Sequence, residues 1–261
     1  MKLKFKKQKF QDDAVAAVAD LFDGQVNAPS SFSVAKIDII EQATEGDLLG
    51  HGNRLALPLA QLQANLHAVQ DRHNLPQTEL EELRFNIEME TGTGKTFVYT
   101  KTIYELNRRY GFTKFVILVP SRAIKEGVNA SIKATSSYFK AEYGKELKAF
   151  IYDSKKLTQV RNFALSPLLE VMIVTIDGIN KDTNLFTRDT EKMDKPARDY
   201  IADCRPIVIS DESHNYGTEK RRKAIEMLEA GKTAKEVDTL WKEELNDFLV
   251  RRQRYLIYGH L

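Results

Sequence analysis

Two short stretches hold the residues best suited to chemistry, and the first reads ETGTGKT over 90–96. A glycine turn that enters a helix directs several backbone N–H groups into one hollow, where the helix N-terminus adds partial positive charge. Glycines also leave room for the close approach of phosphate oxygens. We therefore expect a phosphate cradle here. Its residues are Thr91, Gly92, Thr93, Gly94, Lys95 and Thr96.

Within this cradle, Lys95 is expected to reach the outer phosphates and the Thr96 hydroxyl to bind Mg²⁺. The strict pattern G-x-x-x-x-G-K-[ST] is not met, because Met89 stands in the place of its first glycine. A plain tight turn is the alternative interpretation. The cradle is favoured because apolar alternation predicts a strand over 85–89 before the loop, and helical spacing predicts a helix over 95–109 after it.

The second stretch is DESH at 211–214, which follows the apolar run PIVIS at 206–210. Asp211 is expected to hold the metal and Glu212 to polarise an attacking water. His214 is expected to link the site to a neighbouring domain. The alternative is an acidic helix cap after a buried strand. We favour the metal site because both stretches follow predicted parallel strands, whose carboxyl ends form the ligand-binding edge of an open sheet.

The elements that must position these residues form an α/β pattern from residue 85 onward. Near-continuous Val/Ile runs separated by helical patterns indicate a parallel sheet covered on both faces. The expected strands lie at 85–89, 114–119, 148–152, 171–176 and 206–210, and the helices between them at 95–109, 121–140, 154–165 and 194–203. Before the sheet we expect helices at 10–22 and 55–73 and a strand within 31–40; after it, a tail of two amphipathic helices over 219–252.

Composition excludes several classes of protein. The chain has 261 residues, 42% of them apolar, and a net charge of +2, which is too small to indicate nucleic-acid binding by itself. The single cysteine, Cys204, excludes a disulfide framework and a cysteine zinc cluster. No run is apolar enough for a membrane span, and the basic N-terminus lacks the apolar segment of a secretory signal. We expect a cytoplasmic protein with no membrane contact.

Five stretches together resemble a known family: KFQDDAV, LRFNIEMETGTGKT, VPSRAIKEGV, YDSKKLTQVRNFA and RPIVISDESHN. They resemble the Res subunit of type III restriction endonucleases, in the first RecA-like motor domain of its superfamily 2 helicase core. The resemblance covers about residues 1–217. It implies a RecA-like P-loop NTPase fold, with an N-terminal extension over 1–84, a motor domain over 85–217 and a helical tail over 218–261.

The resemblance also implies residue roles, with ATP and Mg²⁺ as cofactors and DNA as a partner. Gln11 matches a glutamine that hydrogen-bonds adenine, with Phe10 beside it; an exposed helix residue is the alternative. Ser121 and Arg122 match a motif that contacts the nucleic-acid backbone; a strand-end turn with a helix cap at Ser121 is the alternative. Thr175 matches a further backbone contact.

Two departures qualify the resemblance. Ser213 and His214 replace the proline and glutamine usual after Asp-Glu in this family. After residue 217 we find no Ser-Ala-Thr motif, second RecA-like domain, arginine finger or nuclease motif. We therefore expect a truncated or split motor half that hydrolyses ATP weakly alone and depends on a second motor domain and a modification methyltransferase. The alternative is a non-catalytic remnant that binds nucleotide or docks a partner.

Overall fold

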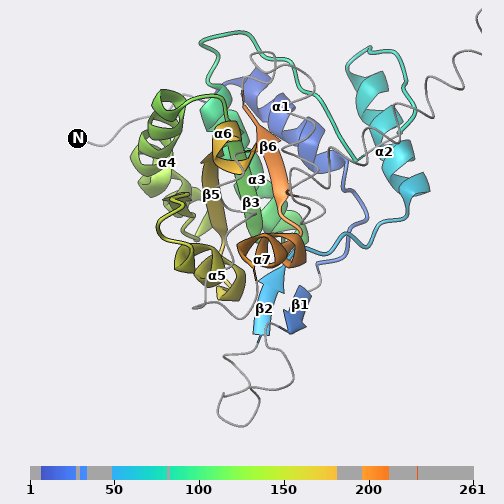
Figure 1. Cartoon of the computed structure of the whole chain (residues 1–261). Coiled ribbons are helices and arrows are strands. Elements are labelled where there is room, and N and C mark those ends of the chain that lie inside the picture. The colour runs from blue at the N-terminus through green and yellow to red at the C-terminus, as the bar shows by residue number, and fades with distance from the viewer. Residues whose placement is uncertain are drawn as a thin grey trace, which may run out of the picture.

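The structure is a computed structural model, and it describes residues 7–27, 30–33, 49–80, 83–180, 196–211 and 228. At its centre is a four-stranded sheet in the order β4-β5-β3-β6 (Figure 1). The strands are β3 (Lys114–Val119), β4 (Lys148–Ile151), β5 (Glu170–Thr175) and β6 (Ile207–Ser210). All three strand pairs are parallel, so the four carboxyl ends lie at one edge.

Helices cover both faces of the sheet, which explains why β3 and β5 are apolar at every position between their ends. Phe115, Ile117 and Val119 of β3 face a layer made by α1 (Lys9–Asp20), α3 (Lys95–Tyr110) and α4 (Arg122–Tyr143). Val116 and Leu118 face the opposite layer, made by α5 (Thr158–Leu165), α6 (Ile176–Asn180) and α7 (Ala197–Cys204). Alternate residues of one strand thus enter two separate cores.

The prediction of a covered parallel sheet is therefore confirmed. The helices and the strands over 114–119, 148–152, 171–176 and 206–210 lie where the periodicity placed them, with bounds shifted by a few residues. The long helix expected over 55–73 is α2 (Leu59–Arg72). The expected tail lies outside the described residues apart from Leu228, which is buried in a helical position.

The prediction of a strand over 85–89 is wrong. The segment is irregular, and within the described part of the chain it pairs with no strand. Ile87, which the alternation assigned to a buried face, is 46% exposed. The glycine loop is therefore held in place by other contacts, described below.

A small hairpin-like pair joins the opposite, amino-terminal edge of the sheet. It consists of β1 (Ser30–Ser33) and β2 (Leu49–Gly52), which pair antiparallel. A Cβ on Gly52 would lie 2.8 Å from the carbonyl oxygen of Cys204, so only glycine fits this close approach. The next residue, Asn53, is buried; its side chain donates to the Lys114 carbonyl at 2.7 Å and accepts from the Lys114 N–H at 3.1 Å.

Candidate functional site

The glycine loop runs directly into α3. Gly92 and Gly94 have φ angles of +81° and +87°, which L-residues rarely adopt, and Gly94 is the N-cap of the helix. Thr93 closes the turn, since its hydroxyl donates to the Glu90 carbonyl at 2.6 Å. Lys95 and Thr96 are consequently the first two residues of α3, where the backbone N–H groups of the first turn and the helix dipole favour an anion.

Gln11 of α1 contacts this loop directly, although it lies more than eighty residues earlier in the chain. Its side-chain amide donates to the Thr93 carbonyl at 2.8 Å. The same amide nitrogen would lie 2.8 Å from a Cβ on Gly94, so glycine at 94 makes room for Gln11. Phe10, the residue before Gln11 in α1, is 48% exposed.

An ion pair fixes α1 against α3 next to this contact. The Lys101 ammonium lies 2.6 Å from Asp12, and its side chain is only 10% exposed. Asp12 follows Gln11 directly, and Lys101 lies on the helix that the glycine loop begins. The pair therefore positions the Gln11 end of α1 over the loop, and sequence reasoning missed it.

Asp211 follows β6 at the carboxyl edge and is 9% exposed. Its N–H donates to the Leu118 carbonyl of β3 at 2.9 Å, which extends the strand pairing by one residue. Tyr99 of α3 donates its hydroxyl to the Asp211 carboxylate at 3.4 Å and is also hydrogen-bonded to the Thr96 side chain. Asp211 and the start of α3 are thus brought together. Glu212 and His214 lie outside the described residues.

Burial, together with the negative charge of Asp211, raises the pKa of Tyr99 well above its ordinary value. Its phenol therefore keeps its proton at physiological pH and acts as a donor to the carboxylate. Sequence reasoning did not select Tyr99. Its spacing of three residues from Thr96 was the available signal, because residues three apart on a helix share a face.

The residues expected to contact a nucleic-acid backbone also lie at the carboxyl edge, after β3 and β5. Ser121 is the N-cap of α4, and its hydroxyl accepts the Ile124 N–H at 3.3 Å. Arg122, the first residue of α4, is exposed. Thr175 ends β5 opposite Val119, and its hydroxyl accepts the Gly178 N–H of α6 at 3.1 Å. Ser121 and Thr175 thus have local capping roles, whatever else they contact.

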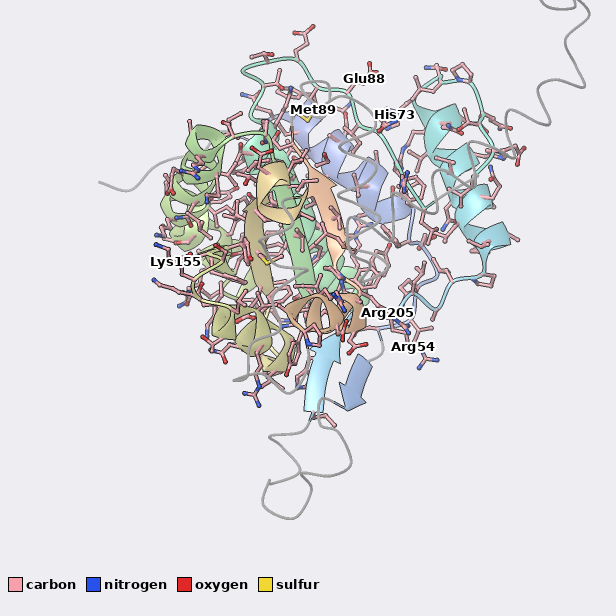
Figure 2. All side chains as sticks on the ribbon, viewed as in Figure 1. Arg54, His73, Glu88, Met89, Lys155 and Arg205 are labelled. Atoms are coloured by element: carbon pink, nitrogen blue, oxygen red, sulfur yellow. The ribbon has the colours of Figure 1, made fainter. Side chains whose placement is uncertain are left out.

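The YDSKKL stretch forms a turn after β4. The Asp153 carboxylate accepts the Lys155 N–H at 2.9 Å, while Tyr152 and Leu157 are buried on either side. Lys155 is exposed and projects from the side of the molecule in Figure 2, where Glu88 and Met89 mark the segment before the glycine loop.

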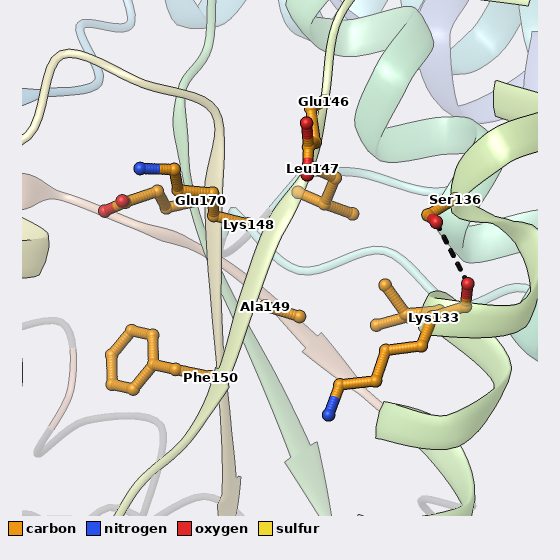
Figure 3. A pocket seen from close by; sticks show the side chains of 9 residues that line it. Lys133, Ser136, Glu146, Leu147, Lys148, Ala149, Phe150 and Glu170 are labelled. Carbon is orange, nitrogen blue, oxygen red and sulfur yellow. Dashed lines mark hydrogen bonds between the residues drawn. The ribbon is translucent and has the colours of Figure 1, made fainter. Parts of the chain in front are cut away.

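A hollow of about 420 Å³ lies elsewhere, between α4 and the amino-terminal ends of β4 and β5 (Figure 3). Lys133, Ser136, Glu146 and Lys148 are among the side chains that line it. This hollow is at the opposite end of the strands from the glycine loop, so it does not belong to the site formed by Gln11, the loop and Asp211.

Comparison with known proteins shows the family. Residues 9–237 match the family model described as "Type III restriction enzyme, res subunit". The chain belongs to this family. Its parallel α/β sheet is accordingly the helicase-like P-loop fold of a RecA-like domain.

Individual relatives agree with this assignment. The chain is similar to the Res subunit of the type III restriction-modification enzyme EcoP15I of Escherichia coli, with 30% identity over 172 residues, 58% of this chain and 17% of the relative. It is 29% identical over 157 residues to the EcoPI Res subunit of Escherichia phage P1, covering 52% of this chain and 16% of the relative. It is 29% identical over 198 residues to the StyLTI Res subunit of Salmonella typhimurium, covering 64% of this chain and 20% of the relative. The chain therefore spans a fifth or less of the length of these relatives.

The side chains present suit a nucleotide with a divalent cation. The hydroxyl of Thr96 and the carboxylate of Asp211 are hard oxygen ligands of the kind Mg²⁺ prefers beside phosphate oxygens. Open space for phosphates lies beside Gly92, where a Cβ would meet nothing within 4 Å. Separately, no helix in the described part of the chain is long and apolar enough to cross a membrane.

Proposed function

We propose that the chain binds ATP with Mg²⁺ at the carboxyl edge of the sheet and is the first motor domain of a DNA-acting type III restriction enzyme. The observation that carries the proposal is the meeting of three distant segments. Gln11 of α1 contacts the Thr93 carbonyl, and Tyr99 links the start of α3 to Asp211 after β6. Family membership over 9–237 supports the same function.

In this proposal each side chain has one role. Gln11 selects adenine through its amide, and Lys95 places a positive charge on the outer phosphates. Thr96 and Asp211 hold Mg²⁺, which when bound neutralises charge on the phosphates. Glu212 orients and polarises the attacking water as a general base.

The nucleic acid is proposed to cross the same edge of the sheet. Arg122 is exposed at the amino end of α4, where a guanidinium can bind a phosphate in a forked geometry. Ser121 and Thr175 lie at the ends of β3 and β5 and add backbone contacts. His214 is proposed to couple this surface to the nucleotide.

Full activity is proposed to require a second motor domain and a modification methyltransferase partner. Arginine fingers supplied from another domain are worth about 10³–10⁵ in rate in phosphoryl-transfer enzymes. The first motor domain by itself is therefore expected to bind nucleotide well but to hydrolyse it slowly. The domain boundaries at 84/85 and 217/218 remain part of the proposal.

The test measures binding of a fluorescent ATP analogue with Mg²⁺, followed by single-turnover hydrolysis with and without DNA. Lys95→Ala is expected to weaken binding at least tenfold, while the matched variant Lys133→Ala, on the exposed side of α4, is expected to bind like the unaltered chain. Absence of nucleotide binding by the unaltered chain would refute the proposal. Binding with no hydrolysis even with a second motor domain added in trans would favour the non-catalytic remnant instead.

The DNA part is tested by the salt dependence of affinity for an oligonucleotide. Arg122→Ala is expected to lower the slope of log K against log salt by about 1, because one phosphate contact is lost. Its nucleotide affinity without DNA is expected to stay unchanged. An unaltered slope would remove Arg122 from the proposed surface.

A further inference from the structure

Tyr99 contacts both of the groups proposed to hold the metal. It lies one turn after Thr96 on α3, and its hydroxyl is hydrogen-bonded to that side chain and to the Asp211 carboxylate at 3.4 Å. Its ring packs against the core between α3 and the sheet. The ring therefore fixes the position of the hydroxyl.

We propose that Tyr99 is a positioning residue that orients the Asp211 carboxylate relative to Thr96 for binding the Mg²⁺ of the nucleotide. This inference rests on the proposed function and adds to it a residue outside both sequence motifs. It requires no contact between Tyr99 and the nucleotide.

The need for such a residue follows from how Asp211 is held. The backbone of Asp211 is fixed by its N–H bond to the Leu118 carbonyl, and a backbone bond by itself does not set the side-chain torsions. A donor on another element selects one orientation of a ligating carboxylate, and loss of such outer partners commonly costs 10–100-fold in metal affinity. Tyr99 is suited to this role because α3 also carries Thr96, so one rigid helix sets the position of both.

The contact also connects the two sides of the site across separate elements. Thr96 and Tyr99 belong to α3, whereas Asp211 follows β6, more than a hundred residues later. When the carboxylate turns toward a metal, the phenol can keep its bond to the second carboxylate oxygen, since a carboxylate has about four acceptor positions. The phenol therefore assists metal binding and need not be displaced by it.

The test varies the Mg²⁺ concentration at a fixed concentration of fluorescent ADP. Tyr99→Phe, which removes only the hydroxyl, is expected to raise the half-saturating Mg²⁺ concentration about tenfold while leaving metal-free ADP affinity unchanged. The matched control is Tyr104→Phe, on the same helix, whose hydroxyl accepts the Leu147 N–H far from Asp211. It is expected to leave the Mg²⁺ dependence unchanged.

A double-mutant cycle with Asp211→Asn separates positioning from a general loss of structure. The effect of Tyr99→Phe on Mg²⁺ dependence is expected to disappear in the Asp211→Asn background. Tyr99→His, which restores a donor on a smaller ring, is expected to bind Mg²⁺-ADP more tightly than Tyr99→Phe. If Tyr99→Phe and the unaltered chain show equal Mg²⁺ dependence, the inference is overturned but the proposed function still stands. If the unaltered chain binds no ADP, both the inference and the proposed function are overturned.

Discussion

Substitution of the two loop glycines by alanine should separate backbone strain from the contact with Gln11. Both residues have φ near +80°, so each alanine carries a conformational cost of about 1–2 kcal/mol. A Cβ at 92 meets nothing within 4 Å, whereas a Cβ at 94 would lie 2.8 Å from the Gln11 amide nitrogen. Gly92→Ala is therefore the matched control for Gly94→Ala.

The additional cost at position 94 follows from the response of Gln11. Its amide is at the end of a flexible side chain and can move away, but it then loses its hydrogen bond to Thr93, worth about 1 kcal/mol. Gly94→Ala should therefore lower the free energy of unfolding by about 1 kcal/mol more than Gly92→Ala. Urea unfolding followed by circular dichroism measures this difference.

The decisive comparison repeats both substitutions in a Gln11→Ala chain. The next atom near a Cβ at 94 other than those of Gln11 is the Phe97 Cβ at 3.9 Å, which is ordinary contact. The two glycine variants should then be equally destabilised. If they already lose the same free energy while Gln11 is present, the contact between Gln11 and the loop does not hold this site together.

Two further predictions concern stability. Asn53→Ala should lower the free energy of unfolding by about 3 kcal/mol in urea titrations, because it leaves the buried N–H and carbonyl of Lys114 without their partner; a loss below about 1 kcal/mol would contradict this. The second prediction concerns Asp20. Burial alone would raise the pKa of its carboxyl, but hydrogen bonds from Arg72 and Arg109, at 2.6 and 2.7 Å, lower that pKa below its ordinary value. Because the pKa of this carboxyl is lower in the folded chain than its unfolded value of about 3.9, its ionisation stabilises the fold at pH values above that unfolded pKa. This stabilisation is lost as the pH falls through the folded pKa. Asp20→Asn should thus cost at most about 1 kcal/mol at pH 7 and progressively less below pH 4, as thermal unfolding across pH would show.

The core sheet was predictable because its two central strands, β3 and β5, are buried on both faces. A run such as Lys114–Val119 is apolar at every position after the first, and such runs recur between helical patterns. The parallel order then places the residues after β3, β5 and β6 at one edge, so the position of Asp211 follows from topology. The position of the glycine loop does not, because no described strand directly precedes it.

The absence of the strand expected over 85–89 shows that an alternating pattern does not predict strand pairing. Alternation reports which side chains could face a core, but a strand exists only where another strand accepts its hydrogen bonds. No described strand does so, and Ile87 remains exposed. Neither β2 nor the buried Asn53 was predicted, because LGHG has no apolar periodicity and an isolated asparagine resembles a turn residue.

The order of the strands determines when this site can form during synthesis. β3 lies between β5 and β6 in the sheet, yet β6 is the last of the four to leave the ribosome. Until residues 207–210 emerge, one backbone edge of β3 is unpaired beside the apolar side chains of Phe115 and Ile117. A nascent chain that has already formed its glycine loop thus exposes an unpaired strand edge that can pair with other chains, and it lacks Asp211 at the proposed metal site. Pairing of β6 with β3 covers that edge and brings Asp211 to the site in the same step.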